Sequence, residues 1–111
     1  MNDRNGNRSF NEILNIISSK SRLRIVFHLL ENKYESKTKL LRLSKVNSKH
    51  FRKQIEVLVN LGILERITIG KRITLFKLNT ESEYYTLLRD IYKALRSHCL
   101  EIKKNARGQL R

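Results

Sequence analysis

The chain has 111 residues, enough for one domain with a single modest core. It carries 24 Lys and Arg against 10 Asp and Glu, a formal net charge of +14, and 40% of its residues are hydrophobic. Hydrophobic residues recur at regular spacing, which excludes disorder throughout the chain. No apolar run approaches the roughly 20 residues that span a bilayer. One cysteine, Cys99, excludes an internal disulfide and a cysteine-based zinc finger.

The excess of positive charge requires a partner that offsets the repulsion among the basic residues. Nucleic acid meets this requirement. A membrane surface would need a helix with a broad apolar face opposite a basic one, whereas the helices predicted below are sides of one core. The first residues are polar and lack the hydrophobic region of a secretion signal. We therefore expect a cytoplasmic protein, associated with the nucleoid, that does not bind membranes.

The chain begins with a polar segment, residues 1–8, that we expect to be a flexible arm. Ser9 is a suitable N-cap for a first helix, because its hydroxyl can accept a hydrogen bond from a free backbone N–H of the first turn. The apolar residues that follow are spaced i, i+3, i+4 and i+7, which places them on one helical face. These residues are Phe10, Ile13, Leu14 and Ile17.

A second helix is predicted over residues 21–31, after a serine-rich interruption at 18–21. This helix is apolar nearly all round, so it should lie at the centre of the domain. Residues 32–35 are polar and indicate a loop or a short edge strand. A third, short helix begins at Ser36 or Lys37, with leucines on its inward face and basic residues on its outward face.

A turn at residues 44–47 separates the third helix from a fourth, which Ser48 should cap. Gly62 should end the fourth helix, because a glycine readily takes the positive φ angle that follows a helix. The opposite face of the fourth helix is basic. Its inward residues are Phe51, Ile55 and Leu58.

Residues 63–69 and 72–79 alternate apolar and polar side chains around Gly70, which predicts a β-hairpin. Thr80 and Glu83 have the spacing of a capping box for a last helix. Apolar residues with nearly heptad spacing then continue to residue 102. After that residue the periodicity is lost, and we expect a basic tail that frays.

The order of these elements is that of a winged helix-turn-helix, a mostly helical α+β fold of four helices, a hairpin wing and a last helix. We expect residues 9–79 to form a DNA-binding domain, residues 80–102 a C-terminal dimerisation helix and residues 103–111 the basic tail. Residues 36–77 hold eleven Lys and Arg against two acidic residues, so they carry most of the net charge. A basic helix-turn-helix with a basic hairpin fits a DNA groove.

The sequence resembles the ArsR/MarR-type winged-helix transcriptional regulators, including the small ones common in archaea and their viruses. Residues 51–64, FRKQIEVLVNLGIL, are similar to the family's recognition helix ending hLxxLxxxGLV, which precedes a wing with a glycine at its tip. Residues 21–25, SRLRI, are similar to the xxRLRIL opening of its second helix. The resemblance implies a homodimer that binds double-stranded DNA through the recognition helix and the wing.

The fourth helix carries the residues that we expect to read bases. A recognition helix enters the major groove with its first turns, where Arg or Lys reaches the acceptors of guanine and Asn pairs with adenine. The residues of those turns that can make such contacts are Asn47, Lys49, His50, Arg52 and Lys53.

Neighbouring basic residues should hold the DNA backbone, which positions the domain without reading sequence. The N-terminus of the fourth helix also favours a phosphate. The residues expected to contact phosphates are Lys37, Lys39, Arg42, Lys45 and Ser48. Lys71 and Arg72 at the wing tip are expected at a minor groove, where narrow A·T-rich segments attract arginine. Arg66 and Lys77 are expected to support them from the wing strands. The alternative for any single lysine is a solvated surface charge.

The apolar stripe of the last helix predicts an interface between two copies of the chain, as the family's terminal helices form. Its alternative role is to pack on the first helix of its own chain. In the dimer, we expect Tyr85 and Leu87 to face the core of their own chain. The residues expected at the interface are Tyr84, Leu88, Ile91, Leu95 and Ile102.

We expect neither a cofactor nor a metal site. Asp90, His98 and Cys99 offer too few ligands to close a tetrahedral site within one chain. Cys99 is more simply explained as a small buried hydrophobic residue than as an intersubunit disulfide or a redox switch. There is no glycine-rich phosphate loop and no serine-hydrolase motif, so we do not expect an enzyme.

The functional prediction is a sequence-specific transcriptional regulator that acts as a homodimer. The main alternative is an architectural or segregation protein that coats DNA with low specificity, since lysines outnumber Asn and Gln on the recognition helix. A winged helix that binds RNA or another protein is a further alternative, against which the basic wing argues.

Overall fold

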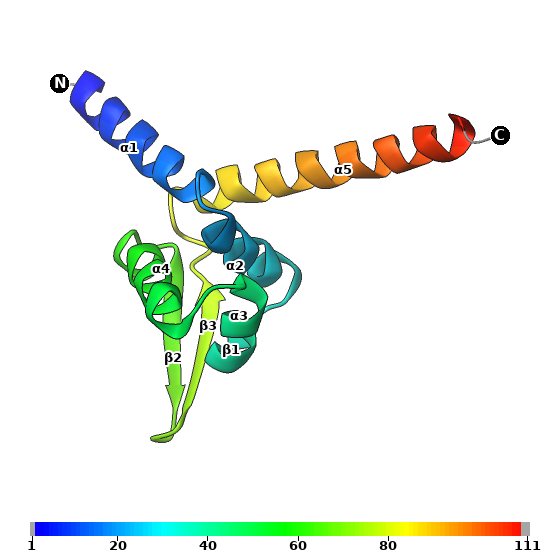
Figure 1. Cartoon of the computed structure of the whole chain (residues 1–111). Helices are drawn as coiled ribbons and strands as arrows, with labels where there is room; N and C mark the ends of the chain where they lie inside the picture. The colour runs from blue at the N-terminus through cyan, green and yellow to red at the C-terminus, as the bar shows by residue number, and fades with distance from the viewer. Residues whose placement is uncertain (1, 110–111) are drawn as a thin grey trace.

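The computed structural model describes residues 2–109 of the backbone and the side chains of residues 8–102. This part of the chain forms five helices and three strands, and Figure 1 shows their arrangement. They are α1 (Asn2–Ile17), α2 (Lys20–Glu31), β1 (Glu35–Ser36), α3 (Lys37–Ser44), α4 (Ser48–Asn60), β2 (Leu64–Ile69), β3 (Ile73–Leu78) and α5 (Tyr85–Gln109). Within the described residues, no helix is long and apolar enough to cross a membrane.

The three strands form one antiparallel sheet in the order β1-β3-β2. β2 and β3 are the predicted hairpin, paired from Leu64 with Leu78 to Ile69 with Ile73. Gly70 takes a φ of 64° in the turn between them. The short β1, which the sequence left open as a loop or an edge strand, pairs with β3 opposite the base of the wing.

The core lies between α2, α4, α5 and the base of the wing. As predicted, α2 is central, and its Ile25 and Val26 are fully buried. The same face of the sheet that carries Leu64 and Phe76 closes the core from the other side. The buried hydrophobic residues are Ile16, Ile25, Val26, Leu29, Leu40, Phe51, Ile55, Leu58, Ile63, Leu64, Phe76, Leu78, Tyr84 and Leu88.

The ends of α4 follow from local hydrogen bonding. Asn47, not the predicted Ser48, is its N-cap, and the Asn47 side chain accepts a hydrogen bond from the backbone N–H of His50 at 2.8 Å. At the other end, Gly62 has the predicted positive φ, 76°. The N–H of Ile63 then bonds to the carbonyl of Leu58, so a buried residue follows the glycine and starts the wing.

The terminal helices differ most from the sequence predictions. α1 begins at Asn2 and not after Ser9, so residues 2–8 belong to the helix instead of forming a separate arm. The predicted capping box is absent, because residues 80–84 form turns and α5 begins only at Tyr85. α5 then continues to Gln109, through most of the segment predicted as a fraying tail. Residues 1, 110 and 111 lie outside the described residues.

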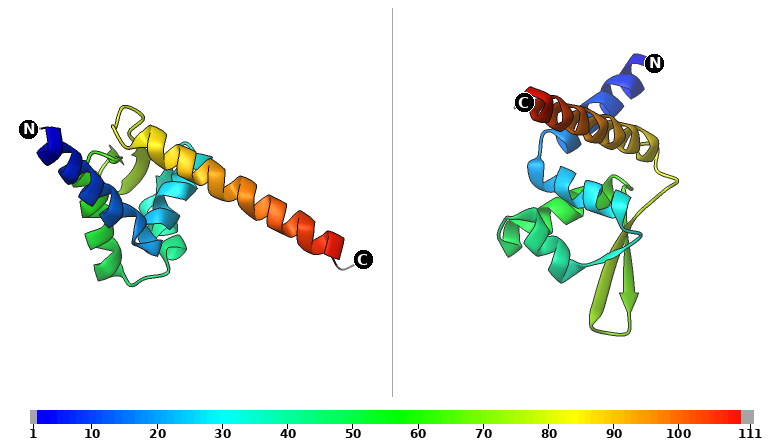
Figure 2. Two further views of the ribbon diagram at one scale, coloured as in Figure 1. Left: turned by 90° about the horizontal axis from the view of Figure 1, so that it is seen from above. Right: turned by 90° about the vertical axis from the view of Figure 1, so that its right-hand side faces the viewer.

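The helices α1 and α5 lie on the side of the domain away from the wing tip (Figures 1 and 2). α5 is anchored on α2, where the rings of Phe27 and Tyr92 are 5.1 Å apart and Arg96 contacts Glu31 at 2.7 Å. Its later turns extend beyond the body of the domain, and side chains 93–102 are all exposed. The wing and α4 therefore occupy one end of the molecule and the two terminal helices the other.

Candidate nucleic-acid interface

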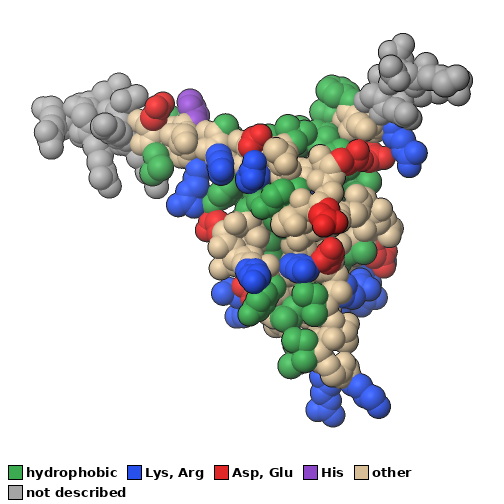
Figure 3. Space-filling view, turned by 180° about the vertical axis from the view of Figure 1, so that it is seen from behind, with side chains coloured by type: hydrophobic (Ala, Val, Ile, Leu, Met, Phe, Trp, Pro, Cys, Tyr) green, Lys and Arg blue, Asp and Glu red, His purple; other side chains and the backbone are tan. Residues whose placement is uncertain are grey.

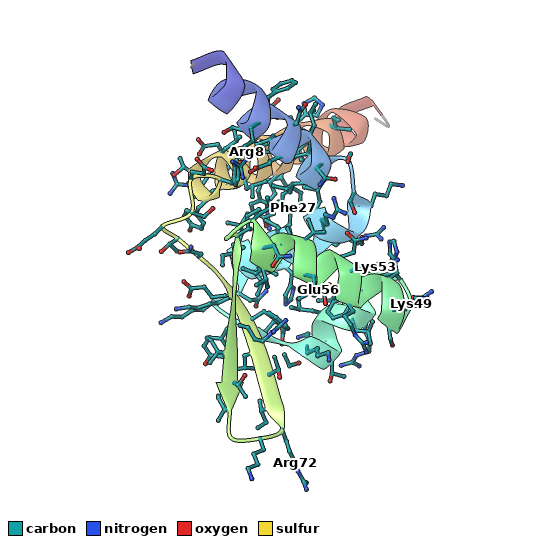
Figure 4. The ribbon with its side chains drawn as sticks, turned by 90° about the vertical axis from the view of Figure 1, so that its left-hand side faces the viewer. Arg8, Phe27, Lys49, Lys53, Glu56 and Arg72 are labelled. Atoms are coloured by element: carbon teal, nitrogen blue, oxygen red, sulfur yellow. The ribbon has the colours of Figure 1, made fainter. Side chains whose placement is uncertain are left out.

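The outer face of α4 presents charged side chains along most of its length. Helical spacing puts Lys49, Lys53 and Glu56 opposite the buried face, and Figure 4 shows them on this helix. Arg52 is also exposed and lies at the edge of this face. The prediction that basic residues occupy the exposed side of the helix is confirmed. The carboxylate of Glu56 among them limits the purely basic surface to the first two turns.

Asn47 is less suited to base readout than its sequence position suggests. Its side-chain oxygen accepts the N–H of His50 at 2.8 Å and caps α4. A bidentate contact with adenine needs both the oxygen and the nitrogen of an Asn side chain. The expected base contact of Asn47 stays a prediction, although its side-chain oxygen already caps α4.

His50 is exposed, but a hydrogen-bond chain fixes its ring. The Oε1 of Gln54 accepts from the Nε of Arg22, so the Gln54 amide nitrogen donates to the Nε2 of His50, at 2.8 Å. Gln54 is only 5% exposed. The sequence analysis missed this chain, because a buried Gln on an apolar face becomes meaningful only once Arg22 of α2 lies beside it.

A cleft of about 290 Å³ separates α4 from the wing. Arg52 of the recognition helix, Arg66 of β2 and Lys37 of α3 all line it, so basic side chains predicted for different roles meet at one place. The three cations outnumber the one carboxylate of the lining, Glu56, so the cleft attracts an anion, and a backbone phosphate is the anion that a duplex offers. The lining residues are Lys37, Phe51, Arg52, Ile55, Glu56, Arg66, Thr74 and Phe76.

The residues expected to contact phosphates from α3 and its turn are all exposed. Lys39 is the one with an acidic neighbour, the Oε1 of Glu35 at 3.5 Å, which lowers its value as a phosphate contact. Lys45 follows α3 in a left-handed conformation with a φ of 59°, which directs the chain into α4. The exposed set is Lys37, Lys39, Arg42, Lys45 and Ser48.

Glu35 also connects α2 to the start of α3. Its carboxylate contacts the Nε2 of His28 at 2.8 Å and accepts the backbone N–H of Ser36 at 3.0 Å. These two hydrogen bonds, the one from His28 first, hold the pKa of Glu35 below its ordinary value. Because Ser36 caps α3, the pair fixes the start of the helix-turn-helix relative to α2.

The wing divides its four predicted basic residues between two places. Lys71 and Arg72 are exposed at the tip, where Figure 4 shows Arg72. Arg66 lies lower, with its guanidinium 5.7 Å from the ring centroid of Phe76. Lys77 contacts its cross-strand partner Glu65 at 3.2 Å and is half-buried at the wing base. Lys77 thus has an acidic partner within its own chain, and its supporting role stays a prediction.

Two residues predicted at the dimer interface belong to the core of their own chain. Tyr84 is 4% exposed and Leu88 is 1% exposed. The hydroxyl of Tyr84 donates to the carboxylate of Glu12 on α1, and burial together with this bond raises the pKa of Tyr84 to about 12. For Tyr84, just before α5, and Leu88, in its first turn, the burial favours the alternative in which this stripe packs within its own chain.

An exposed apolar surface nevertheless runs over α1 and α5. Leu95 and Ile102 of the predicted stripe are exposed, and Ile91 is half-buried. Leu87, which we expected to face its own core, is 43% exposed and shares their helical face. On α1, Phe10 and Leu14 are also exposed, although their spacing suggested burial. We name this set, Phe10, Leu14, Leu87, Ile91, Leu95 and Ile102, the terminal-helix surface.

Among the described residues, no group of three or more His, Cys, Asp or Glu side chains is arranged to hold a metal ion. Cys99 is exposed on α5, contrary to the expectation of a buried small residue. It lies on the part of the helix that extends beyond the domain.

Several solved structures with a similar fold are described as transcriptional regulators. The transcriptional repressor BigR from Xylella fastidiosa has a TM-score of 0.66 and 20% identity, over 84% of this chain and 92% of its own. A MarR family regulator from Silicibacter pomeroyi has a TM-score of 0.64 and 15% identity, over 91% and 72%. An ArsR family regulator has a TM-score of 0.59 and 16% identity, over 85% and 92%. No family sequence model and no curated protein sequence matches the chain.

The chain therefore has the winged helix-turn-helix fold of the MarR- and ArsR-family transcriptional regulators. This confirms the predicted fold class and the resemblance to those regulators. At such low identity the likeness concerns the fold, so function depends on the side chains described above.

Proposed function

We propose that this protein is a transcriptional regulator that binds double-stranded DNA as a homodimer, with no enzymatic activity. The observation that carries the proposal is that α3, α4 and the wing, which carry the exposed basic residues described above, lie at one end of a winged-helix fold. Fold likeness to transcriptional regulators supports it. In this role, α4 enters the major groove, and the wing tip lies at the adjacent minor groove.

The proposed contacts follow from the geometry. Lys49 and Lys53 point away from the core and read guanine acceptors, with His50 beside them. Arg52 reaches a base edge from the side of α4 that faces the wing. A phosphate occupies the cleft beside Lys37 and Arg66, while the tip cations hold the backbone across the minor groove.

The terminal-helix surface is the proposed dimer interface. It lies away from the basic end, so a two-fold pair would present two recognition helices to the same side of a duplex. Such a dimer recognises half-sites about one helical turn apart, that is about 34–36 Å. The extended part of α5 has its apolar side chains exposed in one chain, and a partner helix would bury them.

Low-specificity DNA coating is a second candidate, because one observation favours it. The capping bond of Asn47 and the burial of Gln54 leave the exposed start of α4 dominated by lysine and arginine. Cations bind any phosphate, whereas Asn and Gln supply the paired contacts that select adenine. Under this candidate, the protein would occupy the nucleoid broadly.

Selection from random duplexes tests the proposal. Full-length protein is incubated with a library of random double-stranded DNA, and bound molecules are amplified over several rounds. The proposed regulator enriches a two-fold symmetric site with half-sites one helical turn apart. A library that keeps its random composition while binding tightly would favour the coating protein, and failure to bind duplex at all would reject both.

A further inference from the structure

The tip of the wing carries two exposed isoleucines that the proposed contacts do not use. Ile69 and Ile73 are cross-strand partners at the last paired position before the turn. They are 52% and 53% exposed. Lys71 and Arg72 lie in the turn between them. Figure 3 shows hydrophobic side chains on the wing next to the basic side chains of its tip.

The hairpin does not need apolar residues at these positions. The neighbouring pair, Thr68 and Thr74, is β-branched and polar and fits the same ladder. On the sheet face that holds Ile69 and Ile73, the next pair towards the body is also apolar, Ile67 with Leu75. An apolar sheet face therefore continues to the very end of the wing. An exposed apolar sheet face of this kind favours association, so we expect a binding partner to cover it.

The position of the pair indicates what covers it. A ligand that docks on the turn against Lys71 and Arg72 also comes close to Ile69 and Ile73, because this turn joins the two isoleucines. An anionic partner with an apolar interior meets both demands. A duplex has phosphates for the cations, and its stacked base steps admit apolar side chains from the minor groove. The other exposed apolar residues of α1 and α5 lie at the opposite end of the molecule.

We propose that Ile69 and Ile73 form an apolar wedge that enters a base step of the minor groove and bends the DNA. This inference rests on the proposed function, since the wing must first reach the duplex. Apolar wedges of this type unstack a step partly and kink the helix by roughly 20–90°. Steps such as TA and CA deform most easily, so the wedge would favour sites with a flexible step under the wing, without hydrogen bonds to the bases.

Energy transfer across a labelled duplex tests the wedge. The probe is an A·T-rich duplex of about 40 base pairs with a dye at each end, shorter than the persistence length of about 150 base pairs, so it stays nearly straight when free. Wild-type protein should raise the energy transfer on binding. Ile69→Thr with Ile73→Thr keeps the β-branched shape and removes the apolarity. It should bind within about tenfold of the wild-type Kd, because phosphate contacts dominate affinity, and leave the duplex straight.

Tyr34→Thr is the matched control, because Tyr34 is 55% exposed but does not belong to the hairpin. This variant should bend DNA as the wild type does. The single variants Ile69→Thr and Ile73→Thr, with circular dichroism of each protein, separate loss of the wedge from loss of the fold. They should show intermediate bending with an unchanged spectrum.

Each outcome decides between the inferences. Binding by the wild type without a rise in energy transfer overturns the wedge and leaves the proposed function in place. Equal bending by the double Thr variant also overturns it. If that variant bends DNA normally but self-associates less than the wild type, the isoleucines form a protein contact and the wedge is rejected. Failure of the wild type to bind any duplex rejects the proposed function itself.

Discussion

At the scale of single residues, basic side chains of the same type have different proposed roles, which depend on the residues beside them. Arg52 and Arg66 both line the cleft between α4 and the wing, but Arg66 also stacks on Phe76. Lys77 has a carboxylate partner and lies at the wing base, while Lys71 reaches the tip. Charge alone does not distinguish these roles, whereas the position of each residue relative to α4 does.

Arg52 provides the first prediction. Arg52→Ala should relax specificity at one base position and weaken binding to a preferred site by roughly 1–3 kcal/mol. The measurement is a competition assay with duplexes that differ at single positions. Lys93→Ala on α5 is the control and should change neither quantity. An equal loss on every duplex would contradict base readout and assign Arg52 to the phosphate in the cleft.

Glu35 predicts a pH dependence of stability. Its pKa is lowered in the folded protein, so its contribution is complete above the ordinary value near 4.5 and is lost as the pH falls through the lowered pKa. Glu35→Gln should therefore destabilise the protein at neutral pH, and the difference from the wild type should shrink at pH values below that range. Urea unfolding across this range measures it.

Glu65→Gln is the control for Glu35. The side chains of Glu65 and Lys77 are both partly open to solvent, so loss of their ion pair should cost less than about 1 kcal/mol at neutral pH. A Glu35→Gln difference that stays constant from neutral to acidic pH would contradict the role of the ionised carboxylate beside His28.

At the scale of elements, sequence patterns correctly predicted the features that are determined by residues close together in the chain. The centre of α2, the inward face of α4 and the positive φ of Gly62 all follow from spacing within one segment. The choice of Asn47 over Ser48 as N-cap was beyond the sequence, because adjacent residues that both cap well are locally equivalent. β1 was equally uncertain, since a strand this short forms only through its pairing with β3.

Interactions between distant segments explain the remaining differences. Whether Tyr84 faces a partner chain or its own core depends on where α1 and α2 pack, which the heptad spacing of α5 does not specify. The cleft that joins Lys37, Arg52 and Arg66 likewise exists only in the folded molecule. Residues 2–8 carry no helical signal that explains the early start of α1.

The wing as an element provides the next prediction. Lys71→Ala combined with Arg72→Ala should weaken DNA binding and lower the slope of log Kd against log salt concentration by about 2, because each phosphate contact contributes about 0.9. Lys33→Ala with Lys93→Ala removes the same charge elsewhere and should leave the slope nearly unchanged. A slope that the tip variant does not change would remove the wing from the interface.

At the scale of the whole molecule, the two ends of the protein separate two tasks. The basic end approaches DNA, and the terminal-helix surface at the other end joins two copies under the proposed function. Because the two surfaces are separate, dimer formation can raise the affinity for DNA without changing the contacts of either subunit. Once one subunit has bound its half-site, its partner meets the second half-site at a high effective concentration.

A substitution at Leu95 tests whether the terminal-helix surface forms the dimer interface. Leu95→Glu places a charge within the terminal-helix surface and should shift the protein from a dimer to a monomer of 13.2 kDa in sedimentation. Affinity for a two-half-site duplex should then fall by about 10²-fold. Leu100→Glu is the matched control, because Leu100 is also exposed but lies on the other side of α5. Monomeric wild-type protein would contradict the proposed interface.

The central claim is that the basic end selects a DNA sequence. Its most direct test is the ratio of the Kd for random duplex to the Kd for the selected site, measured at two salt concentrations. A regulator of the proposed kind keeps a ratio of roughly 10³ or more at both concentrations, although each Kd rises with salt. A ratio near one, with the same steep salt dependence for both duplexes, would contradict the claim and identify a protein that coats DNA.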